Sequence, residues 1–191
     1  MGRLDNKVAI VTGAGLGIGR GIAQRYIEEG ARVVIAELLP DVGKEAADAL
    51  GENAFFVETD ASKKESVEHM VQATVDQFGT VDILVNNAWG GGRIGRIEKK
   101  TVDRRNHGLD IGFLGPFWAM CAAHPIMKAK QWGRIVNICS LNGVNAHMGT
   151  AEYNTSKEAL RAATRTAARE WGIDGITANI ICPAAKSNSF D

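Results

Sequence analysis

The segment KVAIVTGAGLGIGRG, residues 7–21, decides the fold of this chain. It starts as a valine- and isoleucine-rich stretch typical of a buried strand, passes through a run of glycines and continues with the pattern of a helix. A turn from a strand into a helix brings free backbone N–H groups and the positive end of the helix dipole to one point, where a phosphate can bind. Gly13, Gly17 and Gly19 let a pyrophosphate approach the backbone there. The segment predicts a dinucleotide site, with a tight turn packed on the sheet as the structural alternative.

A second predicted strand ends at Glu37, about 20 residues after the first glycine, where a carboxylate can accept hydrogen bonds from an adenosine ribose. The same carboxylate repels a 2′-phosphate, and neither Leu16 nor Leu38 offers a cation to hold one. The sequence therefore favours NAD over NADP. Asp60, at the end of the third predicted strand, either contacts the adenine amino group or caps the helix that begins near Ser62.

Strands and helices alternate along the whole chain. The predicted strands span residues 7–13, 31–37, 53–60, 81–88, 133–140 and 175–183. The predicted helices span residues 17–29, 40–50, 62–78, 102–130 and 152–171. The strands are almost continuously apolar, which indicates that both of their faces are covered. The pattern predicts a single α/β domain over residues 1–191, a Rossmann-type doubly wound parallel sheet in strand order 3-2-1-4-5-6 with helices on both faces.

The composition limits the classes of partner. Lys plus Arg and Asp plus Glu each number 22, so the formal net charge is zero, which favours neither a nucleic acid nor an anionic membrane. The first residues show no apolar signal region and no run has the length of a membrane span, so we expect a cytoplasmic location. The basic segment 93–106 predicts a solvated surface helix. Cys121, Cys139 and Cys182 predict reduced core thiols, and no metal site is expected.

Tyr153 and Lys157 lie four residues apart in the last predicted helix, so their side chains share one face. Ser140 ends the fifth predicted strand, at the edge of the sheet that also carries the first glycine turn. A phenol, with a pKa of about 10, is a poor base at neutral pH, and a neighbouring ammonium favours the phenolate. A serine hydroxyl can stabilise charge that develops on a substrate oxygen. The three groups predict a site for alcohol oxidation, against the alternative of an ordinary pair on a helix surface.

Further motifs occur in a fixed order along the chain. They are Thr12-Gly13-x-x-x-Gly17-x-Gly19, Asp60, Asn86-Asn87-Ala88, Ser140, Tyr153-x-x-x-Lys157, and Asn179 with Pro183. On these motifs the chain resembles the classical short-chain dehydrogenases/reductases over essentially its whole length. The resemblance implies an NAD-dependent oxidoreductase that interconverts an alcohol and a carbonyl by hydride transfer. It also implies that Tyr153 is the catalytic acid/base, that Lys157 binds the nicotinamide ribose and lowers the phenol pKa, and that Ser140 orients the substrate.

The resemblance also implies the two sides of a cleft. The expected cofactor side consists of Gly13, Leu16, Gly17, Ile18, Gly19, Glu37, Leu38, Asp60, Ala61, Asn87, Ala88, Tyr153, Lys157 and Pro183. The expected substrate side consists of Trp89, Ser140, Leu141, Asn142, His147 and Met148. His147 is expected to be a polar rim residue rather than a catalyst. The substrate is a small-molecule alcohol or carbonyl, and the helices at 102–130 and 152–171 are expected to form the interface of a homodimer or homotetramer, as they usually do in the family.

Three departures from the family pattern concern the site. Trp89 replaces the glycine that follows Asn-Asn-Ala, and its indole either narrows the pocket or turns outward on the glycines that follow. Gly112 replaces a catalytic Asn that in the family supports a helix kink and a proton-relaying water, and a second water is expected to fill part of the space. The chain stops at Asp191, before the family's substrate-covering segment and last strand, and Ala184 replaces a glycine. We expect a slower enzyme, and the alternative is a nucleotide-binding sensor or scaffold of the same fold with little catalysis.

Overall fold

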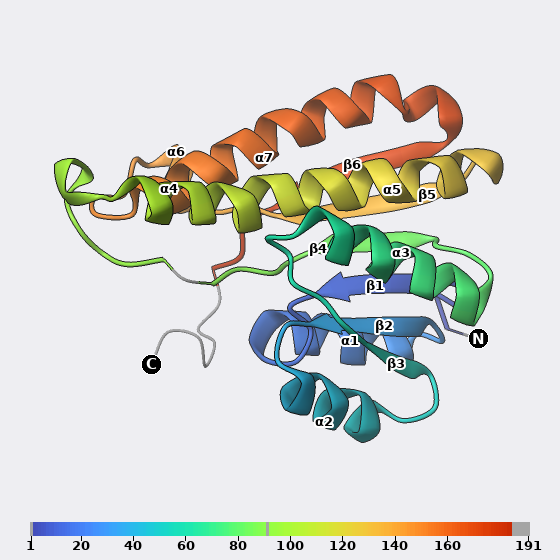
Figure 1. Ribbon diagram of the computed structural model, residues 1–191. Coiled ribbons are helices and arrows are strands. Elements are labelled where there is room, and N and C mark those ends of the chain that lie inside the picture. Colours follow the sequence, from blue (N-terminus) through green and yellow to red (C-terminus); the bar gives the residue numbers. More distant parts are fainter. Residues whose placement is uncertain (1, 91, 185–191) are drawn as a thin grey trace.

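The computed structural model describes residues 2–90 and 92–184 of the 191-residue chain. Its centre is one sheet of six parallel strands in the order β3-β2-β1-β4-β5-β6 (Figure 1). The strands are β1 (Val8–Thr12), β2 (Arg32–Glu37), β3 (Ala54–Glu58), β4 (Ile83–Asn86), β5 (Gly133–Ile138) and β6 (Ile176–Ile181). The order confirms the predicted Rossmann-type α/β fold.

Helices cover both faces of the sheet. They are α1 (Gly17–Glu28), α2 (Pro40–Leu50), α3 (Lys64–Phe78), α4 (Val102–Leu109), α5 (Gly115–Ala129), α6 (Leu141–Val144) and α7 (Ala151–Glu170). Short 3-10 turns occur at η1 (Ile97–Lys99) and η3 (Gly172–Asp174), and a π-helical turn occurs at η2 (Asp110–Leu114). Helices α1 and α2 lie on one face of the sheet, and α3, α5 and α7 lie on the other (Figure 1).

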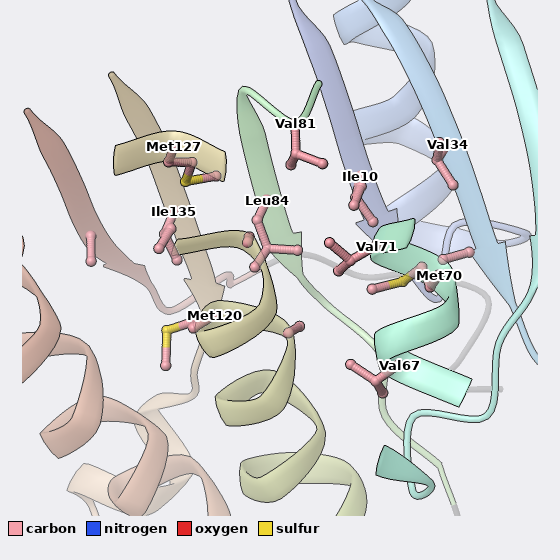
Figure 2. Packing of buried hydrophobic residues seen from close by; sticks show 14 of the residues in the cluster. Ile10, Val34, Val67, Met70, Val71, Val81, Leu84, Met120, Met127 and Ile135 are labelled. Carbon is pink, nitrogen blue, oxygen red and sulfur yellow. The ribbon is translucent and has the colours of Figure 1, made fainter. Parts of the chain in front are cut away.

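Each face of the sheet has its own hydrophobic cluster. On the side of α3 and α5, Ile10, Leu84 and Ile135 pack with Met70 and Met120 (Figure 2). The cluster on the side of α1 and α2 contains Ala9, Val11, Ala23, Val33, Ile35, Ala46, Ile83 and Val85. Successive side chains of a strand point to opposite faces, so neighbouring residues of one strand serve different clusters. This explains why the strands read as continuous apolar runs rather than as alternating ones.

Strand β6 departs from the expectation that both faces are covered. Ile176 and Ala178 are buried, whereas Thr177 and Asn179 are exposed. β6 lies at the edge of the sheet opposite β3, and α1 and α2 pack on β1, β2 and β3. Within the described residues, β6 is therefore covered by α7 on one face only.

The helix expected over residues 102–130 is divided into α4, η2 and α5. Pro116 has no N–H to donate to the carbonyl of Gly112, four residues earlier, so the regular hydrogen-bond ladder is interrupted there. The N–H of Gly115 donates instead to the carbonyl of Asp110, five residues earlier, and a π turn forms. The turn forms around Gly112 without the Asn side chain that supports the helix kink in the family.

Among the described residues, no helix is both long enough and apolar enough to cross a membrane. The expected loss of a substrate-covering segment and last strand concerns the chain from residue 185 onward. These residues lie outside the described part of the chain, so the single-domain boundary at 191 stays a prediction.

Candidate active site

A cleft of about 1060 Å³ opens at the carboxyl ends of the strands. Its walls include the predicted cofactor residues Gly13, Leu16, Ile18, Glu37, Leu38, Ala61, Asn87, Ala88, Tyr153, Lys157 and Pro183. They also include the predicted substrate residues Trp89, Ser140 and Asn142. Parallel neighbouring strands end at the same edge of a sheet, which brings together residues far apart in the chain. Gly17, Gly19, Asp60, Leu141, His147 and Met148 do not line this cleft.

The glycine turn between β1 and α1 is built without room for side chains. Gly13 and Gly17 have φ angles of 62° and 55°, in the left-handed region that favours glycine. A Cβ on Gly19 would lie 2.1 Å from the carbonyl oxygen of Gly13, so Gly19 acts behind the cleft wall. The side chain of Leu16 makes no capping hydrogen bond to α1, which leaves the first N–H groups of that helix without a side-chain cap. The turn therefore leaves room for a pyrophosphate at the start of α1, and the binding of one there stays a prediction.

Thr12 and Asn87 join the glycine turn to the end of β4. The hydroxyl oxygen of Thr12 accepts hydrogen bonds from the N–H groups of Asn87 at 2.9 Å and Ala88 at 3.0 Å. In return, the side-chain amide of Asn87 donates to the carbonyls of Thr12 at 3.0 Å and Gly13 at 3.1 Å. Sequence reasoning assigned no role to Thr12, and its position directly before the first glycine was the available signal. The exchange fixes the floor of the cleft.

Glu37 is held by the backbone around it. Its Oε2 accepts the N–H of Gly15 at 3.1 Å, and its Oε1 accepts the N–H groups of Leu38 at 2.9 Å and Leu39 at 3.3 Å. A carboxylate has about four acceptor sites, so one remains for a ribose hydroxyl. The carboxylate thus has a fixed position in the cleft wall and a fixed negative charge.

Asp60 holds a local turn instead of lining the cleft. Its Oδ1 accepts the N–H of Ser62 at 2.9 Å and the hydroxyl of Ser62 at 2.6 Å. Burial raises the pKa of Asp60, but the hydrogen bonds from Ser62 outweigh this and hold it below its ordinary value. Helix α3 begins later, with Lys63 at its N-cap. The structure therefore gives Asp60 a turn-forming contact, and an adenine contact stays a prediction.

Lys157 is a buried cation beside the predicted acid/base. Its side chain is 2% exposed, and its Nζ donates to the carbonyl of Ile138 at the end of β5, at 2.8 Å. The Nζ lies 5.7 Å from the ring centroid of Tyr153. Burial lowers the pKa of Lys157 to about 8, against a smaller opposing effect of Cys139 and Cys182. The ammonium is therefore close to the phenol but destabilised by its surroundings.

Trp89 turns inward and narrows the pocket, the first of its two predicted orientations. Its indole and the ring of Tyr153 have centroids 4.6 Å apart and planes inclined by 70°. A Cβ on Gly112 would lie 2.8 Å from Cζ3 of Trp89 and 2.4 Å from Oγ of Ser156. These two side chains lie directly beside Gly112, and the expectation that a second water fills part of the space of the missing Asn stays a prediction.

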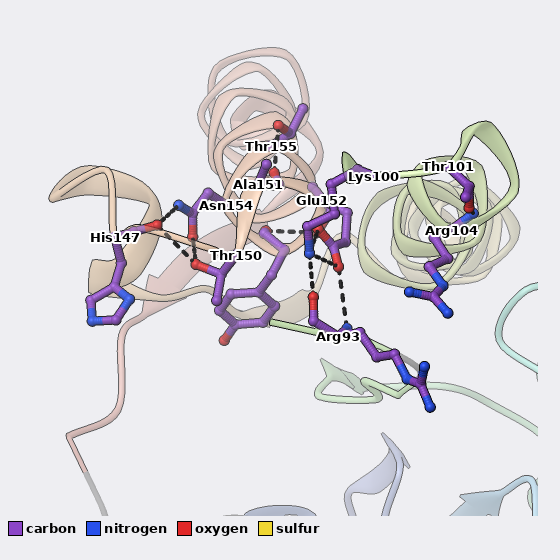
Figure 3. A network of polar contacts seen from close by, with 12 residues as sticks. Arg93, Lys100, Thr101, Arg104, His147, Thr150, Ala151, Glu152, Asn154 and Thr155 are labelled. Atoms are coloured by element: carbon purple, nitrogen blue, oxygen red, sulfur yellow. Dashed lines mark hydrogen bonds and ion pairs between the residues drawn. The ribbon is translucent and has the colours of Figure 1, made fainter. Parts of the chain in front are cut away.

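Ser140 is the N-cap of the short helix α6. Its hydroxyl oxygen accepts the N–H of Asn142 at 3.1 Å, so its own proton remains available for donation. Leu141 is exposed on α6. His147 and Met148 line a neighbouring pocket of about 590 Å³ instead of the cleft. The backbone carbonyl of His147 accepts hydrogen bonds from the side chains of Thr150 and Asn154 (Figure 3).

A buried ion pair, which sequence reasoning missed, fixes one wall of the cleft. Lys100 lies 2.7 Å from Oε2 of Glu152, and their side chains are 8% and 3% exposed (Figure 3). Oε1 of Glu152 also accepts the N–H of Arg93 at 3.3 Å. The expectation that segment 93–106 is a solvated helix is therefore wrong for Lys100, and α4 begins only at Val102. A lysine within a basic run gives no sign in the sequence that it pairs with a carboxylate 52 residues later.

The three thiols differ in their surroundings. Cys139 is buried, and its burial raises the pKa of the thiol to about 11. Cys182 is partly buried, and Cys121 is exposed on α5. The expectation of core thiols is wrong for Cys121, because this residue lies on the face of α5 that points away from the sheet.

A doubly wound sheet with a glycine turn after β1, and with serine, tyrosine and lysine grouped at the same edge, defines the class of Rossmann-fold oxidoreductases. Residues 7–189 match the family model described as short chain dehydrogenase. The chain belongs to this family. Its members bind a nicotinamide cofactor, NAD or NADP, and the family supports an oxidoreductase that acts on alcohols or carbonyls.

Several relatives match most of the chain. One is an uncharacterized oxidoreductase of Bacillus subtilis, 38% identical over 183 residues, with 94% of this chain and 71% of the relative covered. A 12alpha-hydroxysteroid dehydrogenase of a Clostridium species is 33% identical over 201 residues, with coverages of 100% and 77%. An (S)-acetoin-forming diacetyl reductase of Staphylococcus epidermidis is 35% identical over 192 residues, with coverages of 97% and 74%.

Proposed function

We propose that this protein interconverts an alcohol and a carbonyl compound with NAD as its cofactor and Tyr153 as its acid/base. One observation carries the proposal. A single cleft contains both the glycine turn with Glu37 and the group formed by Ser140, Tyr153 and Lys157. Hydride transfer requires that cofactor and substrate meet at the proton-handling residues, and a continuous cleft supports this.

The residues of the cleft support separate roles. When bound, the nicotinamide supplies or accepts the hydride. Tyr153 exchanges a proton with the substrate oxygen. Lys157 lies beside Tyr153, with its Nζ 5.7 Å from the centroid of the Tyr153 ring. Ser140 donates its hydroxyl proton to no other group within the described residues, and it offers this proton to the same substrate oxygen, where charge develops during the reaction.

The position of Glu37 supports NAD over NADP. The backbone N–H groups hold its carboxylate in the wall of the cleft, so the carboxylate cannot move away from a 2′-phosphate without losing them. Two unit charges 4 Å apart repel by about 4 kcal/mol near a protein surface. Leu38 and Leu39, the next residues, are exposed and carry no compensating charge. We expect at least a hundredfold preference for NAD, which parallel titrations with NADH and NADPH would measure.

The relatives support the oxidation or reduction of an alcohol or carbonyl, but they do not point to one particular substrate. Their names refer to compounds as different as a hydroxysteroid and diacetyl. We propose a small-molecule alcohol or carbonyl for this chain, without a nucleic acid or membrane partner. The expected cytoplasmic location also stays a prediction.

A nucleotide-binding protein with little catalysis is the second candidate. Two features of the site favour it. Gly112 lacks the side chain of the family's catalytic Asn, and the indole of Trp89 lies against Tyr153. Both functions share the glycine turn and Glu37, so cofactor binding alone does not separate them.

Turnover separates the two candidates. The full chain is titrated with NAD by calorimetry, and a panel of secondary alcohols is then screened for the appearance of NADH absorbance. We expect binding and turnover, and we expect that Tyr153→Phe abolishes turnover while NAD affinity survives. Binding without turnover across the whole panel would favour the second candidate. A Tyr153→Phe variant with an unchanged rate would overturn the proposed acid/base.

We also propose that the protein forms a homodimer or homotetramer through α5 and α7. Phe117 and Cys121 are exposed on the outer face of α5, although both are apolar in character. A light-scattering mass equal to one chain would contradict this assembly.

A further inference from the structure

We propose that Trp89 is a positioning residue for Tyr153, and that Trp89 and Gly112 form a matched pair. The glycine makes room for the indole, and the indole holds the phenol. The inference rests on the proposed function because it gives Tyr153 the acid/base role. The existence of the matched pair can be tested in the protein without any cofactor.

The indole of Trp89 has a fixed starting point. It follows Ala88, whose N–H is held by the hydroxyl of Thr12 at the floor of the cleft. From there the ring reaches α7, where it meets Tyr153 in an edge-to-face arrangement with centroids 4.6 Å apart. Aromatic pairs favour this geometry because the positive edge of one ring faces the negative face of the other. The contact restricts the orientation of the Tyr153 ring.

Gly112 is required for this position of the indole. A Cβ at 112 would lie 2.8 Å from Cζ3 of Trp89, closer than real Cβ contacts allow. The other neighbour is Ser156, whose hydroxyl donates to the backbone carbonyl of Tyr153. A side chain at 112 therefore displaces either the indole or the turn of α7 that carries the phenol. The volume beside the α-carbon of residue 112 holds either a side chain at 112 or the indole of Trp89, and in this protein it holds the indole.

Two further groups lie against the indole. The Nζ of Lys157 lies 5.7 Å from the centroid of its ring system. A Cβ on Gly92 would lie 3.1 Å from Cζ2 of Trp89, so the loop after β4 packs closely on the ring. Trp89 is thus partly buried: the lysine, the tyrosine, the π turn and the loop lie around it, and its remaining surface lines the cleft. A ring packed on several sides holds its neighbours in place, whereas a ring free on the surface does not.

A thermodynamic cycle tests the matched pair without cofactor. Melting temperatures are measured for the wild type, Trp89→Ala, Gly112→Ala and the double variant. Gly112→Ala is expected to lower the melting temperature in the wild type and to lower it less in the Trp89→Ala background, because only the contact with Ser156 remains. Equal shifts in the two backgrounds would overturn the matched pair.

Kinetics test the positioning role. With the best alcohol of the panel, Trp89→Leu is expected to lower kcat about 10- to 100-fold, since small misplacements of a reacting group have effects of this size. The NAD dissociation constant should change less than threefold. Trp89→Phe, which keeps an aromatic edge, should recover most of kcat, and a kcat of Trp89→Phe no higher than that of Trp89→Leu would contradict a role for the aromatic contact with Tyr153. Equal kcat values for the wild type and Trp89→Leu would overturn the role.

Tyr153→Phe separates this inference from the proposed function. An inactive Tyr153→Phe together with a fully active Trp89→Leu would refute only the role of Trp89. An active Tyr153→Phe would refute the proposed function and the positioning role together, and the melting cycle would still decide whether Trp89 and Gly112 are matched.

Discussion

The ammonium of Lys157 is buried, and its burial lowers the free energy of unfolding. Removing this charge should therefore change how the free energy of unfolding depends on pH. The perturbation is Lys157→Met, which keeps the length and apolar stem of the side chain but has no ammonium. Lys157 is 2% exposed, and its polar contact among the described residues is the carbonyl of Ile138. Burial of this kind disfavours the charged form.

The magnitude follows from the pKa of Lys157, which falls from 10.5 to about 8 on folding. The folded value is lower, so between these two values the unfolded chain binds more protons than the folded one. Stability therefore rises with pH in this range. The full shift corresponds to about 3 kcal/mol, most of which is recovered between pH 7 and pH 10. The Lys157→Met variant has no ammonium at this position, so its stability should not show this rise between pH 7 and pH 10.

The assay is urea unfolding of the wild type and the variant at intervals from pH 7 to pH 10. The stability of the wild type relative to Lys157→Met should increase by about 2–3 kcal/mol over the range. Lys157→Gln is the matched control, because its amide can still donate to the carbonyl of Ile138. It should differ from Lys157→Met by a constant amount and share its pH dependence. Parallel curves for the wild type and both variants would refute the reasoning that the charge is buried at a cost.

Three further substitutions and one control, Gly21→Ala, test the frame of the cleft. Gly19→Ala places a Cβ 2.1 Å from the carbonyl oxygen of Gly13 and should lower both stability and NAD affinity, whereas Gly21→Ala, with open space around it, should raise stability by about 0.5–1 kcal/mol in urea unfolding. Thr12→Ala leaves two N–H groups without their acceptor and should cost about 1–3 kcal/mol in the same assay. Glu152→Gln leaves the buried Lys100 uncompensated and should cost about 3 kcal/mol at pH 7. Burial raises the pKa of Glu152, but hydrogen bonds from Lys100 and the backbone hold it below its ordinary value, so the advantage of the wild type over Glu152→Gln should disappear as the pH falls into the acidic range. A difference that persists in acid would contradict this account.

The architecture could be predicted because its signals are local. The alternation of apolar strands and helices and the glycines at 13, 17 and 19 depend on short stretches of chain, and they led to the observed strand order. The grouping of Tyr153 and Lys157 was equally accessible, since helical spacing alone puts them on one face.

The remaining features depend on contacts between distant parts of the chain. The indole of Trp89 had two possible directions in the sequence, and the absence of a side chain at Gly112 decided for the inward one. Lys100 belongs to a basic segment that the sequence predicts to be exposed to solvent. Lys100 is buried because it pairs with Glu152 on α7, which lies far away in the sequence. Neither result follows from propensity or period, because each is set by which side chain fills a space between elements.

Backbone groups hold the residues that we propose to bind the cofactor and to act beside Tyr153, namely Glu37 and Lys157. Side chains hold the outer wall of the cleft. Three N–H groups fix Glu37, and the carbonyl of Ile138 fixes Lys157. Backbone groups at the ends of strands are positioned by the register of the sheet, so they move little when loop residues change. The loop that carries Arg93 is tied to α7 through the carboxylate of Glu152. Substitutions in this loop can therefore reshape the substrate side of the cleft and leave the chemistry in place, which is consistent with relatives that are similar in sequence and differ in the compounds they are named for.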